Sequence, residues 1–217
     1  SYIFFYSDHG GPFPRHKRAI YETGTKVPFF VKLPKGNKEK VDKSQFLSFV
    51  DFAPTILSIA GINIPSFQQG KPFLGKYKDE SVREYLFTSS DRFDEHPDRI
   101  RAVRGEKYKY IRNYNPENSH ALNVAYRRQM VLMRHLNSLH LTGELSKKHD
   151  LWFRVPKLKE EFYDLENDPF ELNNLSENAD YKEELNKLSN VLDDWLEEID
   201  DLGRIPEKKL FKMISGD

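Results

Sequence analysis

The sequence predicts an α/β fold, and three patterns along the chain indicate it. A continuous apolar run at residues 2–6 is typical of a strand that is covered on both faces of a parallel sheet. A second apolar strand is expected at residues 27–33, and a helical pattern follows it. Beyond about residue 80 the patterns change to a hairpin and an amphipathic helix, which are typical of a smaller α+β subdomain.

The strand at residues 2–6 needs neighbours on both sides, and the chain offers few other strands of that kind. We therefore expect the sequence to begin inside a larger α/β domain. An edge strand at a natural N-terminus is the alternative. The helix expected after the second strand has Asp51 as its N-cap, Pro54 in its first turn and Gly61 just beyond its C-terminal end.

The second half of the chain alternates strand and helix signals. The expected elements are a strand at 85–88, a hairpin that pairs 100–103 with 108–111 around Gly105, helical structure over 119–142, a strand at 162–165 and a helix at 181–200. Asp180 and Glu183 fit a capping box at the start of the last helix. Leucines at helical spacing along this helix predict that it packs against a sheet.

Composition excludes several classes of protein and site. The 34 basic and 34 acidic side chains balance to a formal charge of +0, whereas a nucleic-acid binder usually carries a basic excess. The lack of cysteine excludes disulfides, thiolate metal sites and a cysteine nucleophile within these 217 residues. No apolar run approaches the roughly 20 residues of a membrane span. We therefore expect neither nucleic acid nor a membrane among the partners.

Asp8 and His9 directly follow the first strand, at the end where α/β sheets place their ligands. A carboxylate oxygen and an imidazole nitrogen suit a divalent cation, and the glycines at positions 10 and 11 allow a tight turn. An ordinary loop in which the histidine caps a carbonyl is the alternative.

A basic cluster of Arg15, Lys17 and Arg18 lies a few residues further on. Fixed cationic groups beside a metal ion suit a substrate with a tetrahedral oxyanion, either sulfate or phosphate. A solvated basic loop would explain the same residues, although two strongly apolar strands flank this one.

Six short motifs cover nearly the whole chain in one order. They are SDHG at 7–10, KRAIYETG at 17–24, VPFFVKLP at 27–34, VDFAPTILSIAGI at 50–62, DRIRAVRGEKYKYIRNY at 98–114 and FYDLENDPFELNNL at 162–175. In this combination the chain resembles the C-terminal part of a type I, formylglycine-dependent sulfatase of the alkaline phosphatase superfamily. The resemblance implies that residues 1–80 complete an alkaline-phosphatase-like sheet domain. It implies that residues 81–217 form a smaller α+β subdomain, in which a helix packs on a four-stranded antiparallel sheet.

The resemblance also implies roles for the residues of the first loop. In that family the strand-end Asp and its neighbour ligate a divalent cation, usually calcium, so Asp8 and His9 are the expected metal ligands. A lysine four residues before a Tyr-Glu pair contacts the sulfate group, which makes Lys17 the expected catalytic contact. Arg15 is an expected auxiliary contact to substrate.

One part of the family's machinery is missing from this sequence. The formylglycine nucleophile is made from the first residue of a C/S-x-P/A-S-R motif, and no such motif occurs here. The first pair of metal-binding aspartates of the family is missing too. We therefore expect the missing N-terminal half of the protein to be a partner of this chain, and the chain alone to be inactive.

We expect residues 89–101 to form the segment that reaches over the pocket in which the sulfate group binds. Its side chains Arg92, Asp94, Glu95 and His96 are candidate contacts to sugar hydroxyls and anionic groups. A charged surface turn ahead of a strand is the alternative.

The leading interpretation is hydrolysis of the sulfate ester of a sulfated carbohydrate, by attack of formylglycine with help from the cation. A phosphohydrolase of the same superfamily is the first alternative, and it would need two zinc ions with further histidine ligands. An inactive binding module is the second. The resemblance implies a periplasmic, extracellular or lysosomal location.

Overall fold

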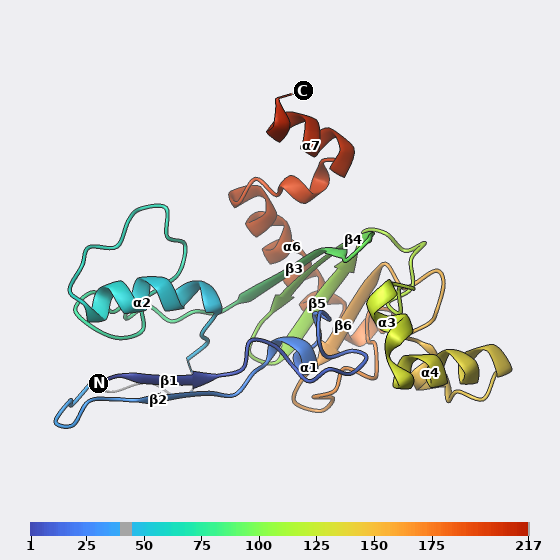
Figure 1. The fold of residues 1–217 in the computed structure, drawn as a ribbon, viewed down its shortest axis with the longest axis horizontal. Coiled ribbons are helices and arrows are strands. Elements are labelled where there is room, and N and C mark those ends of the chain that lie inside the picture. Colours follow the sequence, from blue (N-terminus) through green and yellow to red (C-terminus); the bar gives the residue numbers. More distant parts are fainter. Residues whose placement is uncertain (40–44, 217) are drawn as a thin grey trace. The chain divides into compact units, whose positions relative to one another are not determined.

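The computed structural model describes residues 1–39 and 45–216, which form two compact units (Figure 1). One unit combines Ser1–Phe5 with Phe29–Leu86, and the other combines Tyr6–Pro28 with Phe87–Asp217. The structure thus groups the loop that carries the candidate site residues with the second half of the chain. The division at residue 80, which concerns domains of a larger protein, stays a prediction.

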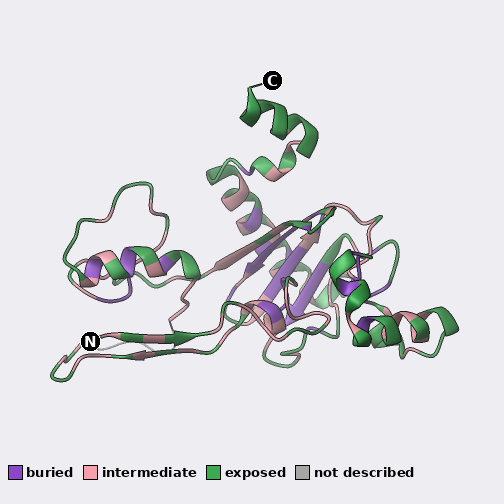
Figure 2. Cartoon of the chain, in the orientation of Figure 1, coloured by how far each residue is buried: buried purple, intermediate pink, exposed green. Residues whose placement is uncertain are grey.

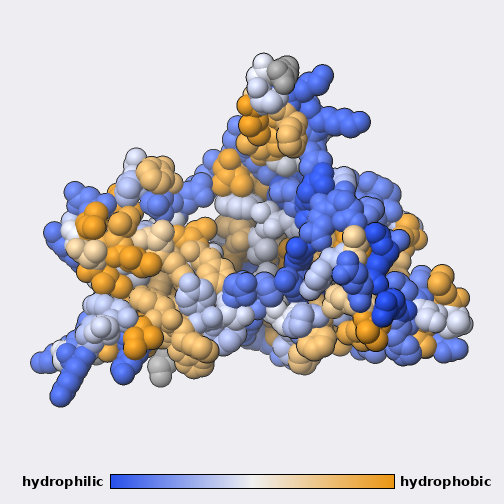
Figure 3. Space-filling view, viewed as in Figure 1, coloured by the Kyte–Doolittle hydropathy of each residue, from blue (hydrophilic) through white to orange (hydrophobic). Residues whose placement is uncertain are grey.

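The first unit is built from a two-stranded sheet and one helix. Strand β1 (Ile3–Tyr6) pairs with β2 (Phe29–Lys32), and the 3₁₀ helix η1 (Phe49–Asp51) leads into α2 (Phe52–Ile59). The described residues leave the side chains of β1 open, with Ile3 51% and Phe5 67% exposed, so they do not supply the cover on both faces that the apolar run predicts. Figure 3 shows apolar residues gathered on the surface of this unit.

The start of the helix in the first unit differs from the prediction in its hydrogen bonds. Asp51 holds the predicted N-cap position of α2, but its side chain makes no cap hydrogen bond to that helix. Its carboxylate instead accepts a hydrogen bond from the N–H of Ser48, the N-cap of η1, at 2.7 Å. Asp51 is fully buried and forms an ion pair with Arg83. The prediction for Gly61 is confirmed, because it follows the helix with φ at +72°, a conformation that favours glycine.

The second unit is organised around a four-stranded sheet. Its strands are β3 (Leu86–Phe93), β4 (His96–Arg104), β5 (Tyr108–Asn113) and β6 (Glu160–Asp164), in the order β3-β4-β5-β6. Strands β4, β5 and β6 run antiparallel, with Ala102 opposite Ile111 and Tyr110 opposite Phe162. The predicted hairpin is confirmed, since the Gly105 N–H donates to the Tyr108 carbonyl at 2.9 Å.

Strand β5 is buried on both faces (Figure 2). Because side chains alternate along a strand, its even-numbered and odd-numbered residues face different partners. On one face, Arg112 forms an ion pair with Asp193 of helix α6 (Lys182–Glu198). On the other face, Ile111 packs in one cluster with Ile20 and Tyr21 of the first loop. The sheet therefore holds α6 on one side and the candidate site loop on the other.

Helix α6 confirms the expected packing against a sheet. Its residues Leu185, Leu188 and Leu192 are buried, and Trp195 stacks on Phe87 of β3 with ring centroids 4.5 Å apart. The predicted capping box at Asp180 is not formed. The Asn178 side chain instead accepts from the Asp180 N–H at 3.0 Å and starts the 3₁₀ turn that precedes the helix.

The remaining helices are short and lie between or after the strands. They are α1 (Glu22–Thr25), α3 (Ala125–Gln129), α4 (Val131–Thr142), α5 (Lys147–Asp150), η2 (Ala179–Tyr181), η3 (Leu202–Arg204) and α7 (Glu207–Ser215). The helical stretch predicted over 119–142 is broken at Met130, whose ψ of 123° is extended. None of the helices in the described part of the chain is long and apolar enough to cross a membrane.

Candidate functional site

Asp8 and His9 lie side by side on the loop that follows β1. The ring nitrogen Nδ1 of His9 is 2.6 Å from the Gly10 carbonyl oxygen. Because a carbonyl only accepts, Nδ1 carries the hydrogen and Nε2 keeps a free lone pair. Nε2 is 3.5 Å from Asp8 Oδ2, so a nitrogen donor and an oxygen donor occupy adjacent positions.

Gly10 connects the Asp8–His9 pair to the far end of the loop, at Gly24. Its N–H donates to the Gly24 carbonyl at 3.0 Å. A Cβ at Gly10 would lie 1.9 Å from the Thr23 carbonyl oxygen, so no other residue fits there without a backbone shift. The Ser7 hydroxyl also donates to the His9 carbonyl at 2.6 Å. These contacts explain why a small residue follows the Asp-His pair.

The donor set fits one edge of a divalent-cation site. The Asp8 side chain is 82% exposed, and the Nδ1–H bond of His9 is the kind of contact that orients a metal-binding imidazole. Residues 1–39 and 45–216 contain no group of three His, Asp or Glu side chains that could hold a metal ion. Further ligands would have to come from outside these residues, and the two-zinc arrangement of the phosphohydrolase alternative has no support in them.

Tyr21 anchors the same loop to the sheet through a buried network. The Tyr21 hydroxyl donates to Glu161 Oε2 at 2.8 Å, and the hydroxyl of Tyr163 donates to the same oxygen at 2.6 Å. The Asn113 side chain donates to Glu161 Oε1 at 2.7 Å, and Nε2 of His120 lies 3.3 Å from that oxygen. Burial alone would raise the pKa of Glu161, but the contacts from His120, Tyr163 and Asn113 outweigh it and lower the pKa to about 2.

Glu22 forms a second anchor with residues far along the chain. The fully buried Lys109 ammonium lies 3.3 Å from Glu22 Oε1 and 3.1 Å from Glu171 Oε1. Glu171 also accepts from the Glu22 N–H at 2.6 Å. Separating a buried ammonium from its two carboxylate partners costs free energy, so this contact stabilises the position of the loop on the sheet. Sequence reasoning missed Glu161 and Lys109, although a charged residue inside a buried strand pattern is the signal that could have found them.

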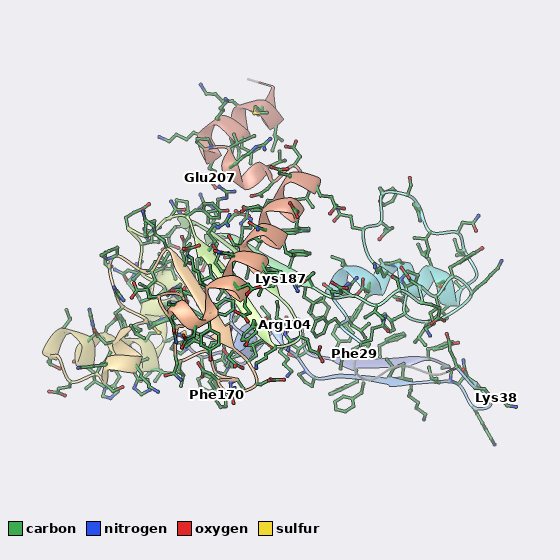
Figure 4. All side chains as sticks on the ribbon, turned by 180° about the vertical axis from the view of Figure 1, so that it is seen from behind. Phe29, Lys38, Arg104, Phe170, Lys187 and Glu207 are labelled. Atoms are coloured by element: carbon green, nitrogen blue, oxygen red, sulfur yellow. The ribbon has the colours of Figure 1, made fainter. Side chains whose placement is uncertain are left out.

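Arg15, the predicted auxiliary substrate contact, faces the protein. Its Nη2 donates to the Glu171 carbonyl at 2.8 Å and to the Phe170 carbonyl at 3.3 Å. Its guanidinium carbon lies 3.8 Å from the centroid of the Tyr21 ring. Figure 4 labels Phe170 on the segment that follows β6. Arg15 therefore connects the first loop to the segment that follows β6.

Lys17 differs from its basic neighbours because its ammonium has no hydrogen bond or ion pair in the part of the chain that the structure describes. Its backbone N–H donates to the Gly11 carbonyl at 3.1 Å, which places it close to the Asp8–His9 turn. Its Nζ lies 5.8 Å from the centroid of the Tyr126 ring. The side chain lines a small cavity of about 20 Å³, where it is free to meet an anion.

The predicted substrate segment lies at the turn between β3 and β4. Arg92 donates from Nε to Glu207 Oε1 of α7 at 2.7 Å, and Glu207 is labelled in Figure 4. Asp94 forms an ion pair with Arg18 of the first loop. The Glu95 carboxylate accepts from the Ala125 N–H at 2.7 Å. Backbone hydrogen bonds of this kind lower its pKa.

His96 begins β4 and is half-buried, and its side chain makes no hydrogen bond within the described residues. Of the four predicted substrate contacts, Asp94 is therefore the one that the structure brings to the loop of Asp8, His9 and Lys17. The ion pair between Asp94 and Arg18 joins the turn to that loop.

Solved structures with the same fold are sulfatases. A 2-O GAG sulfatase superposes with a TM-score of 0.65 at 21% identity, over 95% of this chain and 38% of its own length. A second structure, described as "in complex with its substrate D-Glucosamine-2-N, 6-O-disulfate", superposes with a TM-score of 0.61 at 21% identity, over 94% and 36%. These likenesses confirm the expected α+β arrangement of sheet and packed helix.

Curated relatives are also sulfatases, and the chain spans about a third of their length. An ulvan-active sulfatase of Formosa agariphila is 44% identical over 98% of this chain and 35% of its own length. An N-acetylglucosamine-6-O-sulfatase of Bacteroides thetaiotaomicron is 26% identical over 99% and 32%. The human N-sulphoglucosamine sulphohydrolase is 24% identical over 89% and 41%.

The match to a protein family covers the loop from Gly11 onward and the strands β3, β4 and β5. Residues 11–129 match the family described as "N-sulphoglucosamine sulphohydrolase, C-terminal". The chain therefore belongs to this family and is a C-terminal portion of a sulfatase of the alkaline phosphatase-like superfamily.

Proposed function

We propose that the complete enzyme containing this chain hydrolyses sulfuric ester bonds of a sulfated glycan. The observation that carries the proposal is the paired donor geometry of Asp8 and His9, whose Oδ2 and Nε2 atoms are 3.5 Å apart. The same loop presents the Lys17 ammonium, which forms no ion pair with the part of the chain that the structure describes. Membership in a family of sulfatases supports the reaction class.

Each of these residues has a defined task in such a reaction. Asp8 and His9 would hold a divalent cation, for which we propose calcium, and the cation would draw charge from the sulfate oxygens. The Lys17 ammonium would bind the sulfate and offset charge on the leaving oxygen. The nucleophile, proposed to be formylglycine, would come from the remainder of the protein.

The substrate class follows from the relatives. The relatives are an ulvan-active sulfatase, an N-acetylglucosamine-6-O-sulfatase and a protein in complex with a disulfated glucosamine as its substrate, and all three names refer to carbohydrates. We extend this class to the present chain, with Arg92, Asp94, Glu95 and His96 as candidate sugar contacts. The proposed location is the periplasm, the cell exterior or a lysosome. The chain alone is proposed to be inactive.

Release of sulfate tests the proposed function. The complete enzyme should release inorganic sulfate from sulfated oligosaccharides, measured by ion chromatography, and lose this activity with a chelator. Lys17→Ala should lower kcat by about 100- to 1,000-fold, the usual cost of removing a charge-stabilising contact. Lys26→Ala is a matched control, because Lys26 is an exposed lysine a few residues away. Unchanged turnover in Lys17→Ala, or turnover of phosphate esters alone, would refute the assignment.

A metal-binding measurement tests the cation separately. Asp8→Asn should weaken calcium binding to the complete enzyme by calorimetry, and the isolated chain should not hydrolyse a sulfate ester. Tighter binding of zinc or manganese than of calcium would reject calcium while leaving the site in place.

A further inference from the structure

Two arginines, Arg18 and Arg127, share the ring of Phe93. The guanidinium carbon of Arg127 lies 4.0 Å from the Phe93 centroid, and that of Arg18 lies 4.8 Å from it. The three residues line two small cavities of about 20 and 30 Å³, and Lys17 lines the first of these. Lys17, Arg18 and Arg127 thus border the first cavity together, and Lys17 is the proposed sulfate contact.

Arg127 has an incomplete set of partners. Its residue is only 7% exposed, and both of its hydrogen bonds leave from Nη1, at 2.8 Å to the His120 carbonyl and at 2.5 Å to the Ala121 carbonyl. Among the described residues, its Nε and Nη2 have no hydrogen-bond acceptor and the guanidinium forms no ion pair, although the charge of Asp94 acts on it and raises its pKa in part. Burial and the charge of Arg18 lower the pKa of Arg127 to about 10. A buried cation without a counter-ion is costly, and an anion placed there would offset that cost.

The nearby carboxylates do not neutralise these cations. Asp94 forms an ion pair with Arg18. Its single negative charge does not balance the three positive charges of Lys17, Arg18 and Arg127. Asp98 lines the second cavity, but its carboxylate is buried and bonded to Lys157. The space beside Phe93 therefore carries an excess of positive charge.

Two exposed aromatic rings border the first cavity. The exposed rings of Phe13 and Tyr126 border it and provide apolar surface for a sugar face. Its volume of about 20 Å³ accommodates one or two water-sized atoms, which matches the terminal oxygens of an acidic group that enters from the rim.

We propose that Arg18 and Arg127 form an anion subsite that binds a second acidic group of the glycan, either a uronate carboxylate or a further sulfate. The subsite rests on the proposed function and deepens it, because it makes the preferred substrate a polyanionic oligosaccharide. The acidic group would accept hydrogen bonds from the free guanidinium nitrogens. The sulfate to be hydrolysed would lie at Asp8, His9 and Lys17.

Matched substrates test the subsite in the complete enzyme. We would compare three sulfated disaccharides whose neighbouring sugar is neutral, carries a carboxylate or carries a second sulfate. The parent enzyme should have a kcat/KM about 10- to 100-fold higher on one of the two acidic substrates, the range expected for hydrogen bonds to charged groups. The better of the two identifies the acidic group.

Variants show whether the arginines cause that preference. Arg18→Gln should remove at least about 10-fold of the preference, and Arg127→Lys, which keeps the charge, should remove part of it. Arg128→Gln is the matched control, since Arg128 is exposed and donates to the Asn123 carbonyl at 2.7 Å. An equal loss on all three substrates, or no preference in the parent enzyme, would overturn the subsite.

A binding measurement separates this proposal from the proposed function. An unsulfated disaccharide with one uronate or, if the parent enzyme prefers the second sulfate, a monosulfated one, titrated by calorimetry, should bind the parent enzyme at least about 10-fold more tightly than it binds Arg18→Gln. Such binding without any sulfate release would leave the subsite standing and reject the hydrolase. Hydrolysis of the neutral substrate, with no effect of Arg18→Gln on binding, would support the hydrolase and reject the subsite.

Discussion

The Tyr21 hydroxyl donates a hydrogen bond to the Glu161 carboxylate at 2.8 Å, across 140 positions of sequence. This contact ties the loop of Asp8, His9 and Lys17 to strand β6. The loop has little regular structure of its own, so buried side-chain contacts to the sheet determine where its charged groups lie.

Removing the Tyr21 hydroxyl should loosen that attachment. We expect Tyr21→Phe to lower the free energy of unfolding of the complete enzyme by about 1–2 kcal/mol, because a buried charged acceptor loses one donor. Thermal or urea denaturation measures this. Tyr126→Phe is the control, since that ring is 43% exposed and should change stability by less than about 0.5 kcal/mol. Equal stability of the two variants would contradict the role of the contact.

Acid should weaken the protein through Glu161. Its folded pKa of about 2 lies below the value of about 4.3 for an unfolded glutamate, so its contribution to stability is complete above the unfolded value and is lost as the pH falls toward 2. The contribution amounts to about 3 kcal/mol. The difference in unfolding free energy between the parent enzyme and Glu161→Gln should therefore shrink between pH 5 and about 2. A constant difference over that range would refute this linkage.

Gly10 should tolerate no side chain. In Gly10→Ala the new Cβ would meet the Thr23 carbonyl at 1.9 Å, and relief of that clash requires a backbone shift that costs about 1–3 kcal/mol. We expect weaker cation binding as well, because the shift moves the neighbouring His9. At Gly11 the nearest atoms to a Cβ would belong to side chains, Phe13 at 3.1 Å and His16 Nδ1 at 3.6 Å, which can move more easily than backbone. Gly11→Ala is therefore the matched control and should lose less in both calorimetry and denaturation.

Arg101 provides a test away from the site. This fully buried guanidinium lies 2.6 Å from Asp91 Oδ1 and 2.8 Å from Asp201 Oδ1, and these contacts connect β4 to β3 and to the segment after α6. Asp201→Asn should cost about 3 kcal/mol because it leaves a buried cation undercompensated. The neighbouring variant Asp200→Asn removes an exposed ion pair with Arg204 and should cost less than about 1 kcal/mol. Similar stabilities for the two variants would be inconsistent with this account.

Features that depend on neighbours in the sequence could be predicted from the sequence alone. The hairpin around Gly105, the leucine stripe of α6 and the left-handed Gly61 are of this kind. Each depends on a turn residue or on a repeat within a few positions, and these signals act over short distances. The order of the six motifs likewise carried the family resemblance, and the adjacency of Asp8 and His9 is a property of the chain itself.

The tertiary structure decided which charged groups meet. No local signal predicts that Tyr21 reaches Glu161, that Glu22 shares Lys109 with Glu171, or that Arg127 is buried with no ion pair among the described residues. Local propensity placed Asp51 at the N-cap of α2 but did not predict that its carboxylate bonds back to Ser48 at the start of the preceding 3₁₀ helix. The physical reason is that a buried charge is stable only beside a partner, and folding rather than sequence spacing brings that partner within a few ångströms.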